Sequence, residues 1–273
     1  MIYNNILEAM GHTPMVRLHK LPAPGSAEIL VKVEALNVGG SIKSRTALNM
    51  IEEAEKAGLL SPDSVIVEPT SGNQGIGLAL VGAIKGYKTV IVMPDSVSLE
   101  RRKLVHHYGA EVRLVHDDGD IGKCIEECLQ TALRMREADP KVFIPQQFSN
   151  PDNKYAHIRY TAQEILEQVG GPIHGFCSGI GTGGTISGIG DGIIPEILNQ
   201  EIYSDICVIT DEEALETAKR LAKEEGLMVG ISSGTNVAAA LKLAKKLGKG
   251  KTVVTVLPDT AERYFSTPLF EGE

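Results

Sequence analysis

Residues 64–93 read SVIVEPTSGNQGIGLALVGAIKGYKTVIVM and contain a complete strand–helix–strand unit. β-Branched residues are frequent at both ends of this stretch, at residues 64–68 and 89–93, which favours a strand at each end. Residues 73–84 between them have the spacing of a helix. Val90, Ile91 and Val92 are apolar at successive positions, as expected for a strand covered on both faces. The stretch therefore predicts two parallel strands joined by a helix.

The same alternation of strands and helices extends along nearly the whole chain. Further strands are predicted at residues 29–34, 111–116, 142–144, 173–178, 205–209 and 252–257. Further helices are predicted at residues 42–57, 98–108, 121–138, 154–169, 212–225 and 235–247. We therefore predict an α/β fold of mainly parallel sheets flanked by helices. Pro, Asn and Gln interrupt the alternation at residues 145–153, so we place a boundary there, between a domain 1–146 and a domain 147–273.

The composition is that of a globular protein and argues against several classes of function. The 273 residues include 27 Lys and Arg against 35 Asp and Glu, which gives a net charge of −8. Nucleic-acid binding needs a basic surface, so we expect no nucleic-acid partner. No apolar run reaches about 18 residues, so we expect no membrane span. The N-terminus lacks the basic and apolar regions of a secretion signal, so we predict a cytoplasmic protein.

The 4 cysteines have neither the spacing of a metal site nor that of a disulfide framework. Cys124 and Cys128 lie one helical turn apart in a predicted helix, so we expect them on one face as buried thiols. The segment HDDGD at residues 116–120 follows a predicted strand and is interpreted as a polar loop. No second ligand group is placed to close a site there, so we predict no metal.

Ligands bind to parallel sheets at the carboxyl ends of the strands, where strand-to-helix loops meet. The first such loop reads NVGGSIKSR at residues 37–45. Ser41 is a candidate N-cap, which places Lys43 in the first helical turn, where the helix dipole disfavours a cation. A lysine amine with a lowered pKa forms a Schiff base more readily. Lys43 is therefore a candidate for imine chemistry, and the alternative is a solvated surface lysine.

The second loop reads PTSGNQG at residues 69–75 and combines hydroxyls, an amide and glycines at a predicted helix start. Free backbone N–H groups at such a start bind anions, and a substrate carboxylate would suit the site. The alternative is a simple N-cap formed by Ser71 or Asn73.

The third loop reads GIGTGGT at residues 179–185, and its glycines allow the backbone to approach a phosphate closely. The loop also fits the G-x-G-x-x-G pattern of dinucleotide binding, which would indicate a nicotinamide-dependent dehydrogenase. Asp205 has too little chain before it to be the ribose-binding acid of a complete unit, so a single phosphate is favoured. An imine-forming lysine, a carboxylate site and a phosphate site together indicate pyridoxal phosphate and an amino acid.

The sequence resembles the fold-type II pyridoxal-phosphate enzymes, specifically the cysteine synthase and cystathionine β-synthase family. The resemblance covers nearly the whole chain in ordered motifs: HTPMVRL (12–18), GGSIKSR (39–45), EPTSGNQGIG (68–77), QQFSNPDN (146–153), GIGTGGTISG (179–188), VGISSG (229–234) and LPDTAERY (257–264). It implies two domains with the active site in the cleft between them, and first strands that cross to the sheet of the other domain. It also implies a homodimer.

The resemblance implies a role for individual residues. Lys43 would bind the cofactor covalently and then move the α-proton of the substrate. Asn73 would contact the ring hydroxyl, and Thr260, where the family usually has a serine, would contact the pyridine nitrogen. The cofactor phosphate would lie on Gly181, Thr182, Gly183, Gly184 and Thr185. The substrate would be bound by Thr70, Ser71, Gly72, Gln74 and Gln147.

Two departures from the family pattern bear on the reaction. Gln74 replaces the usual threonine and adds a longer amide beside the carboxylate site. Asp191 stands where cysteine synthases usually have a small neutral residue, and its carboxylate could act as a general base near the β-carbon. The alternative for Asp191 is a loop or capping residue that faces solvent.

Together these features predict β-replacement or β-elimination on L-cysteine with release of hydrogen sulfide. The α-aminoacrylate that remains would give L-serine with water, or lanthionine with a second cysteine. The alternative within the family is a cysteine synthase that uses O-acetylserine and sulfide. The alternatives from other classes are a dehydrogenase and a binding protein that keeps the cofactor without turnover.

The family pattern also predicts that a segment is missing. Only Ile186 and Ser187 separate Thr185 from the Gly-Ile-Gly that precedes Asp191, where the family has about one further helix-plus-strand unit. Such a unit has about 30 residues. Loss of a central strand leaves buried backbone groups unpaired, so we expect either that the natural protein contains this unit or that the unit was removed deliberately.

Overall fold

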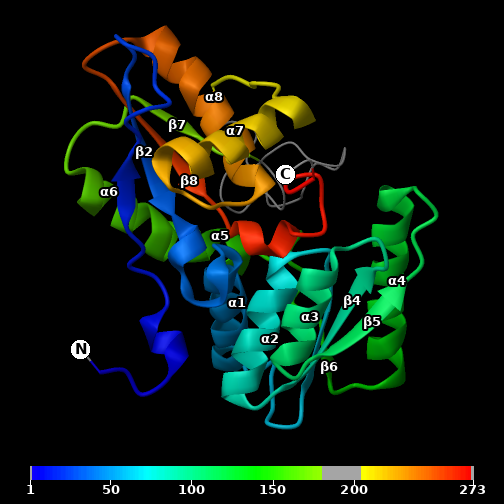
Figure 1. Cartoon of the computed structure of the whole chain (residues 1–273). Helices are drawn as coiled ribbons and strands as arrows, with labels where there is room; N and C mark the ends of the chain where they lie inside the picture. Colours follow the sequence, from blue (N-terminus) through cyan, green and yellow to red (C-terminus); the bar gives the residue numbers. More distant parts are fainter. Residues whose placement is uncertain (1, 180–203, 272–273) are drawn as a thin grey trace.

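The computed structural model describes residues 2–179 and 204–271, and their strands form two sheets. Figure 1 shows these sheets in an upper and a lower lobe of the molecule. Sheet I contains, in spatial order, β1 (Met15–Arg17), β2 (Glu28–Val33), β8 (Thr252–Leu257) and β7 (Gly175–Cys177). Sheet II contains β5 (Glu111–Val115), β4 (Lys88–Pro94), β3 (Val65–Pro69) and β6 (Val142–Phe143).

Neighbouring strands are parallel in both sheets, except that β1 is antiparallel to β2. The predicted α/β fold of parallel sheets flanked by helices is confirmed. In sheet I, β2 pairs with β8 over six residues, so a strand from near the start of the chain lies beside one from near its end. Sheet II is formed by a continuous part of the chain, residues 65–143.

Both faces of sheet II are buried, because alternate residues of its strands enter different hydrophobic cores. Ile66 of β3 packs in the core beneath α1 (Lys43–Lys56) and α2 (Asn73–Lys85). The next residue, Val67, packs on the opposite face beneath α4 (Ile121–Ala138). This double burial explains why the strands are apolar at successive positions.

The predicted burial of the two helical thiols is confirmed. Cys124 is 4% exposed and Cys128 is 1% exposed, and both belong to the core between α4 and sheet II. Burial raises the pKa of the Cys128 thiol to about 12, so this sulfur is protonated at neutral pH. Both cysteines therefore act as small apolar core residues.

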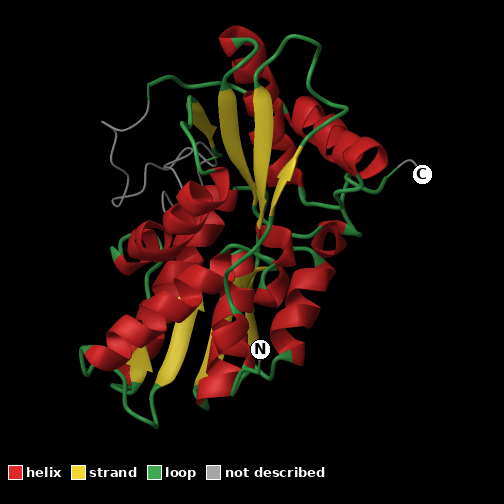
Figure 2. Ribbon diagram, turned by 90° about the vertical axis from the view of Figure 1, so that its left-hand side faces the viewer, coloured by secondary structure: helices red, strands yellow, loops and turns green. Residues whose placement is uncertain are grey.

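Of the remaining helices, α3 packs against α2 and β5 of sheet II, and the others cover sheet I and the junction between the sheets (Figure 2). α7 and α8 pack against each other, and α8 packs on sheet I. Their bounds, with those of the helices not yet given, are α3 (Leu99–His107), α5 (Asp152–Ala156), α6 (Ala162–Val169), α7 (Asp211–Glu225) and α8 (Ile231–Leu247). A short π-helix, η4 (His157–Thr161), joins α5 to α6, so the predicted helix at 154–169 continues through a locally wider turn. No described helix is long and apolar enough to cross a bilayer.

Some local expectations were wrong. Residues 205–209 are not a strand, because Ile206 and Val208 are exposed and no described strand pairs with this stretch. Ser41 is not the N-cap of α1, which is Ile42, because Ser41 instead forms a bridge with Asp259. Neither Ser71 nor Asn73 caps α2, whose N-cap is Gly72. β1 was not predicted, because three residues give too short a pattern.

Four charged residues, three of them buried and Glu164 partly exposed, join sheet I to the helices of the junction. Lys32 of β2 lies 2.7 Å from a carboxylate oxygen of Glu164 in α6. Arg45 of α1 lies 2.6 Å from the other oxygen of Glu164 and 2.9 Å from Glu34. The Lys32 and Glu34 side chains are fully buried, and two positive charges balance two negative ones. Removal of one partner would therefore leave an uncompensated charge inside the protein.

We predict that Glu164→Gln lowers the free energy of unfolding by about 3–5 kcal/mol, because Arg45 and Lys32 lose their shared carboxylate. Urea unfolding at pH 7 measures this loss. The matched control is Glu224→Gln, which breaks the surface pair with Arg220 and should change the urea midpoint little. Equal midpoints for Glu164→Gln and the wild type would contradict the importance of the buried charges.

The stability of the wild type and that of Glu164→Gln should depend differently on pH in the acid range. Burial opposes ionisation of Glu164, but hydrogen bonds from Arg45 and Lys32 outweigh burial and lower its pKa to about 2. The unfolded state therefore binds the proton first, and this contribution to stability is lost as the pH falls from about 4.5 towards 2. Unfolding midpoints between pH 5 and pH 3 should fall less steeply for Glu164→Gln than for the wild type.

Candidate active site

Three segments far apart in the sequence meet between the two sheets. The N–H of Ile42 donates to the carbonyl of Pro258 at 2.8 Å, and the N–H of Thr260 donates to the carbonyl of Gly40 at 3.3 Å. The loop before α1 therefore lies against the segment that follows β8. The loop at the start of α2 joins them, because the Asn73 amide donates to the Asp259 carboxylate at 2.6 Å. These contacts bring Lys43, Asn73 and Thr260 to one region of the junction.

Lys43 is the first residue of α1, and the close packing of α1 against α2 restricts its surroundings. A Cβ atom on Gly77 of α2 would lie only 3.0 Å from the Lys43 carbonyl oxygen, so glycine permits this approach. Desolvation by burial lowers the pKa of the Lys43 amine to about 8. At pH 7 to 8 a substantial fraction of the amine is thus uncharged and nucleophilic, as imine chemistry requires.

Asn73 is held by the segment that follows β8. In addition to its bond to Asp259, its side-chain oxygen accepts a hydrogen bond from Arg263. The Tyr264 hydroxyl donates to the same Asp259 oxygen at 2.7 Å. Burial raises the pKa of the Asp259 carboxyl, and its other oxygen has no partner among the described residues. The role of Asn73 towards a ring hydroxyl stays a prediction, and its side chain is already oriented by Asp259 and Arg263.

Three of the predicted substrate residues surround one small cavity. A cavity of about 30 Å³ is lined by residues that include Thr70, Ser71 and Gln147. The Thr70 hydroxyl accepts a hydrogen bond from the Gly72 N–H at 3.3 Å, which shapes the loop before α2. β3 ends directly before Thr70 and β6 ends shortly before Gln147, so the two loops meet at one edge of sheet II.

Gln74, the departure from the family pattern, lies in the interior rather than on the surface. It is 2% exposed, and its side-chain oxygen accepts a hydrogen bond from the Thr46 hydroxyl at 2.7 Å. Thr46 also donates to the Lys43 carbonyl at 3.0 Å, so Gln74 is connected to the first turn of α1. The Gln74 amide nitrogen has no partner among the described residues.

The predicted phosphate residues Gly181, Thr182, Gly183, Gly184 and Thr185, as well as Asp191, lie outside the described residues. The strand that leads to them is described. β7 pairs with β8, and the Thr255 hydroxyl donates to the Cys177 carbonyl at 2.8 Å. The N–H of Gly179 then donates to the Asn236 side chain of α8. The glycine-rich loop therefore begins at the carboxyl edge of sheet I, the edge at which Asp259 and Thr260 also lie.

The residues at this junction fit a polar cofactor. Buried polar atoms without a described partner lie on the three converging segments: Ser41 Oγ, Ser44 Oγ, Gln74 Nε2 and Asp259 Oδ1. A buried polar atom without a partner costs free energy, so a bound polar group is expected beside them. Pyridoxal phosphate combines an aldehyde, a ring hydroxyl and a ring nitrogen, and the lysine, amide and hydroxyl groups present are suitable partners for these groups.

The family profile described as "Pyridoxal-phosphate dependent enzyme" matches residues 6–202 and 191–259. The chain belongs to this family. It is 43% identical to the cysteine synthase of Staphylococcus aureus (strain N315) over 305 residues, covering 98% of this chain and 97% of that protein. It is thus an enzyme that uses pyridoxal phosphate, and it is related to the cysteine synthases. This result leaves the dehydrogenase alternative without support.

Two solved structures have the same fold. A hydrogen sulfide-producing enzyme from Fusobacterium nucleatum superposes with a TM-score of 0.90 at 36% identity, covering 96% of this chain and 100% of that one. The cysteine synthase of Entamoeba histolytica superposes with a TM-score of 0.91 at 35% identity, covering 100% of this chain and 92% of that one. The fold-type II assignment is therefore confirmed.

The comparisons also agree with the missing segment. The alignment with the Staphylococcus aureus enzyme spans 305 residues, more than the 273 of this chain. The family profile matches in two pieces that overlap at residues 191–202, next to the position where the unit is absent. In sheet I, β7 is an outer strand that has three residues and only one described partner, β8.

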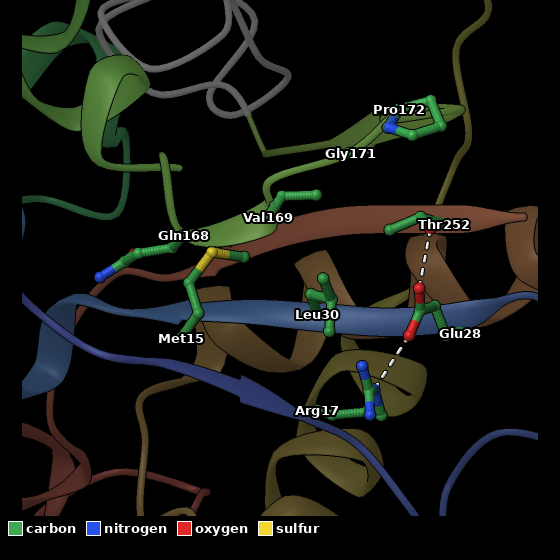
Figure 3. Close-up of a pocket in the computed structure, with 9 residues that line it drawn as sticks. All are labelled: Met15, Arg17, Glu28, Leu30, Gln168, Val169, Gly171, Pro172 and Thr252. Carbon is green, nitrogen blue, oxygen red and sulfur yellow. Dashed lines mark hydrogen bonds and ion pairs between the residues drawn. The ribbon is translucent and has the colours of Figure 1, made fainter. Parts of the chain in front are cut away.

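A second cavity lies away from this site. It has a volume of about 370 Å³ and lies beside β1, β2 and the end of α6 (Figure 3). Its charged residues are already paired, because Arg17 lies 2.9 Å from Glu28, which also accepts a hydrogen bond from Thr252. The described His, Cys, Asp and Glu residues also form no group that could hold a metal.

Sequence reasoning missed Asp259, Arg263 and Tyr264 as residues of this site. All three belong to the motif LPDTAERY, from which only Thr260 was chosen. Asn73, which bonds to Asp259 and Arg263, is 186 residues from Asp259, so only the folded chain shows the connection. His157 is 6% exposed and bonds to Thr161 at 3.0 Å, as expected for a packing residue.

We predict that Lys43→Ala abolishes covalent attachment of pyridoxal phosphate and lowers turnover at least about 10³-fold. Borohydride reduction followed by mass spectrometry detects the attachment. In the wild type the rate of attachment should rise with pH and level off above about 8, because only the uncharged amine reacts. Lys56→Ala, at the other end of α1, is the control. Cofactor retained covalently in Lys43→Ala would contradict the assignment.

Proposed function

We propose that this enzyme acts on L-cysteine and releases hydrogen sulfide by β-elimination or β-replacement, giving L-serine or lanthionine. The observation that carries the proposal is the desolvated Lys43 amine, whose pKa is about 8. The Lys43 backbone carbonyl is also connected, through the Thr46 hydroxyl, to Gln74 in the first turn of α2. An amine with this pKa can both accept and return a proton near neutral pH.

The cofactor supplies an electron sink at the substrate α-carbon, which allows the β-substituent to leave. The residues of this chain provide orientation and proton transfer. We propose that Lys43 Nζ takes the α-proton of the bound amino acid. Thr70, Ser71, Gly72 and Gln147 would bind the α-carboxylate. The Gln74 amide nitrogen, which has no partner among the described residues, would donate a further hydrogen bond beside them.

Electrostatics favour an anionic substrate group at this place. The loop of residues 70–72 leads into α2, and the first N–H groups of a helix point out of its N-terminus. They attract a carboxylate through the helix dipole as well as through hydrogen bonds. The same loop holds no carboxylate side chain of its own that could occupy the position.

The choice of L-cysteine rests on Asp191 and on one similar protein. We propose that the Asp191 carboxylate acts as a general base for water or for a second thiol near the β-carbon. The solved enzyme from Fusobacterium nucleatum, which is described as hydrogen sulfide-producing, supports this choice. The second candidate is cysteine synthesis from O-acetylserine and sulfide, which the name of the Staphylococcus aureus relative favours. We also propose a cytoplasmic homodimer.

The first experiment is sulfide release from L-cysteine alone, measured on the cofactor-loaded protein. We expect sulfide with an equal amount of L-serine and lanthionine combined. Absence of sulfide, together with cysteine formation from O-acetylserine and sulfide, would instead establish the second candidate. If the wild type releases sulfide, Asp191→Ala should reduce the rate of that release about 10²-fold or more, as loss of a general base does. A parental rate in Asp191→Ala would remove this residue from the mechanism.

We predict that Gln147→Ala and Ser71→Ala raise the KM for L-cysteine about tenfold while kcat changes less, since each removes a donor to the carboxylate. Steady-state kinetics at fixed pH measure both constants. Gln130→Ala, on the exposed face of α4, is the control. An unchanged KM in both site variants would show that the carboxylate binds elsewhere.

A further inference from the structure

Glu68 is a buried carboxylate that the proposed reaction does not use. It lies near the end of β3, one residue before Pro69 and two before Thr70, and it is 0% exposed. A buried carboxylate needs partners that compensate for the loss of water. Among the described residues, Glu68 forms no salt bridge; its partners are two backbone N–H groups.

Both partners of Glu68 belong to the loop that carries Gln147. One oxygen accepts from the N–H of Gln146 at 2.9 Å, and the other accepts from the N–H of Gln147, also at 2.9 Å. Gln146 has φ of +57°, the left-handed region that non-glycine residues rarely occupy. Successive N–H groups around such a residue point to one side and form an anion-binding concavity. The Glu68 carboxylate fills this concavity.

The sequence explains why a side chain replaces the sheet at this point. β3 and β6 pair only through Val65 and Ile66, opposite Val142 and Phe143. Continuation of the same register would place Pro145 opposite Glu68, and proline has no N–H for a ladder. The ladder therefore ends, and the Glu68 side chain makes the hydrogen bonds to the loop instead.

The bond to Glu68 holds Gln147 from one side, and a second contact holds it from the other. The Gln147 carbonyl accepts a hydrogen bond from the Asn153 amide at 2.7 Å. Gln147 is 4% exposed, so its backbone has little freedom. Because Glu68 and Thr70 lie on the same short segment, the Glu68 carboxylate ties the Gln147 loop directly to the Thr70–Ser71 loop.

We infer that Glu68 is a positioning residue that sets the distance between Gln147 and the Thr70–Ser71 loop, and so the affinity for the substrate α-carboxylate. This inference rests on the proposed role of these residues in carboxylate binding. In this role, Glu68 touches neither the substrate nor the cofactor. Its effect is therefore selective for ligands that have a carboxylate.

The charge state of Glu68 provides an independent readout. Burial raises its pKa to about 7, against the opposing effect of the Gln147 and Gln146 N–H groups. Protonation converts one acceptor oxygen into a hydroxyl donor that faces an N–H, so the loop loses one bond below about pH 7. The loop at residues 144–149 has no titratable side chain. On the elements packed against β3, Lys88 of β4 lies opposite Val65, three residues before Glu68 along the strand, and Lys85, in the last turn of α2, is paired with Glu55. Cys124 and Cys128 of α4 pack with Val67, on the other face of the sheet.

The test compares L-serine with ethanolamine, which is the same molecule without the carboxylate. Calorimetry on the cofactor-loaded enzyme measures the dissociation constants of both ligands at pH 8. We expect Glu68→Gln to weaken L-serine about tenfold and ethanolamine less than twofold, with turnover affected mainly through KM. Glu28→Gln, which changes a carboxylate in sheet I, should leave both affinities unchanged. Equal weakening of both ligands, or no weakening, would overturn the inference.

Gln147→Ala separates this inference from the proposed function. If Gln147→Ala leaves the dissociation constant of L-serine unchanged, the proposed location of the carboxylate site is wrong. If Gln147→Ala weakens L-serine and Glu68→Gln does not, only the positioning role fails. The inference also requires that the double variant Glu68→Gln/Gln147→Ala binds L-serine about as weakly as Gln147→Ala alone. The two effects should not add, because both residues act on one contact.

Wild-type enzyme provides the test if Glu68→Gln does not fold. The ratio of L-serine affinity to ethanolamine affinity cancels the titration of the amine and of the cofactor. We expect this ratio to fall several-fold between pH 8 and pH 6, because Glu68 is protonated in that interval. A ratio that stays constant across the interval would contradict the positioning role.

Discussion

The buried ion pairs around Arg45 fix the relation between the two sheets, and the catalytic geometry depends on that relation. Arg45 follows Lys43 by two residues in α1, and its guanidinium binds Glu34 and Glu164. Glu164 also binds Lys32, the second-last residue of β2. The first turn of α1 is thereby attached to sheet I, although the rest of the helix packs on the helices of sheet II. The network has two positive and two negative side chains, so its net charge is zero, which limits the free-energy cost of burying it.

Because this network has no net charge, the charged and polar groups of the candidate active site are set by other residues. Lys43 has a lowered pKa because it is desolvated, and the carboxylates of the network serve Arg45 and Lys32. At the carboxyl edge of sheet I, Asp259 orients Asn73 and Tyr264 and keeps one oxygen without a described partner. At the edge of sheet II, Glu68 uses both oxygens on backbone N–H groups. Each buried acid thus has a different task, determined by the donors around it.

The sequence predicted the features that depend on local patterns. The strand–helix–strand unit at residues 64–93 appears as β3, α2 and β4 with ends displaced by one residue, because its apolar runs and turn residues are local. Lys43 was found because a cation at a helix start contradicts the dipole. Features that depend on distant partners could not be predicted: the Asp259–Asn73 bond joins residues 186 positions apart. The failed strand at 205–209 shows the same limit, since an apolar run becomes a strand only when another strand pairs with it.

The position of β8 has a consequence for the order of folding. Sheet II comes from one continuous stretch, residues 65–143, so it can form on the ribosome as soon as that stretch emerges. Sheet I cannot, because β8, close to the C-terminus, lies between β2 and β7. Until synthesis reaches residue 257, the β2 and β7 edges that β8 later covers stay unpaired and open to other chains. The segment that completes sheet I also carries Asp259, so the residue that orients Asn73 is put in place in the same step that covers these strand edges.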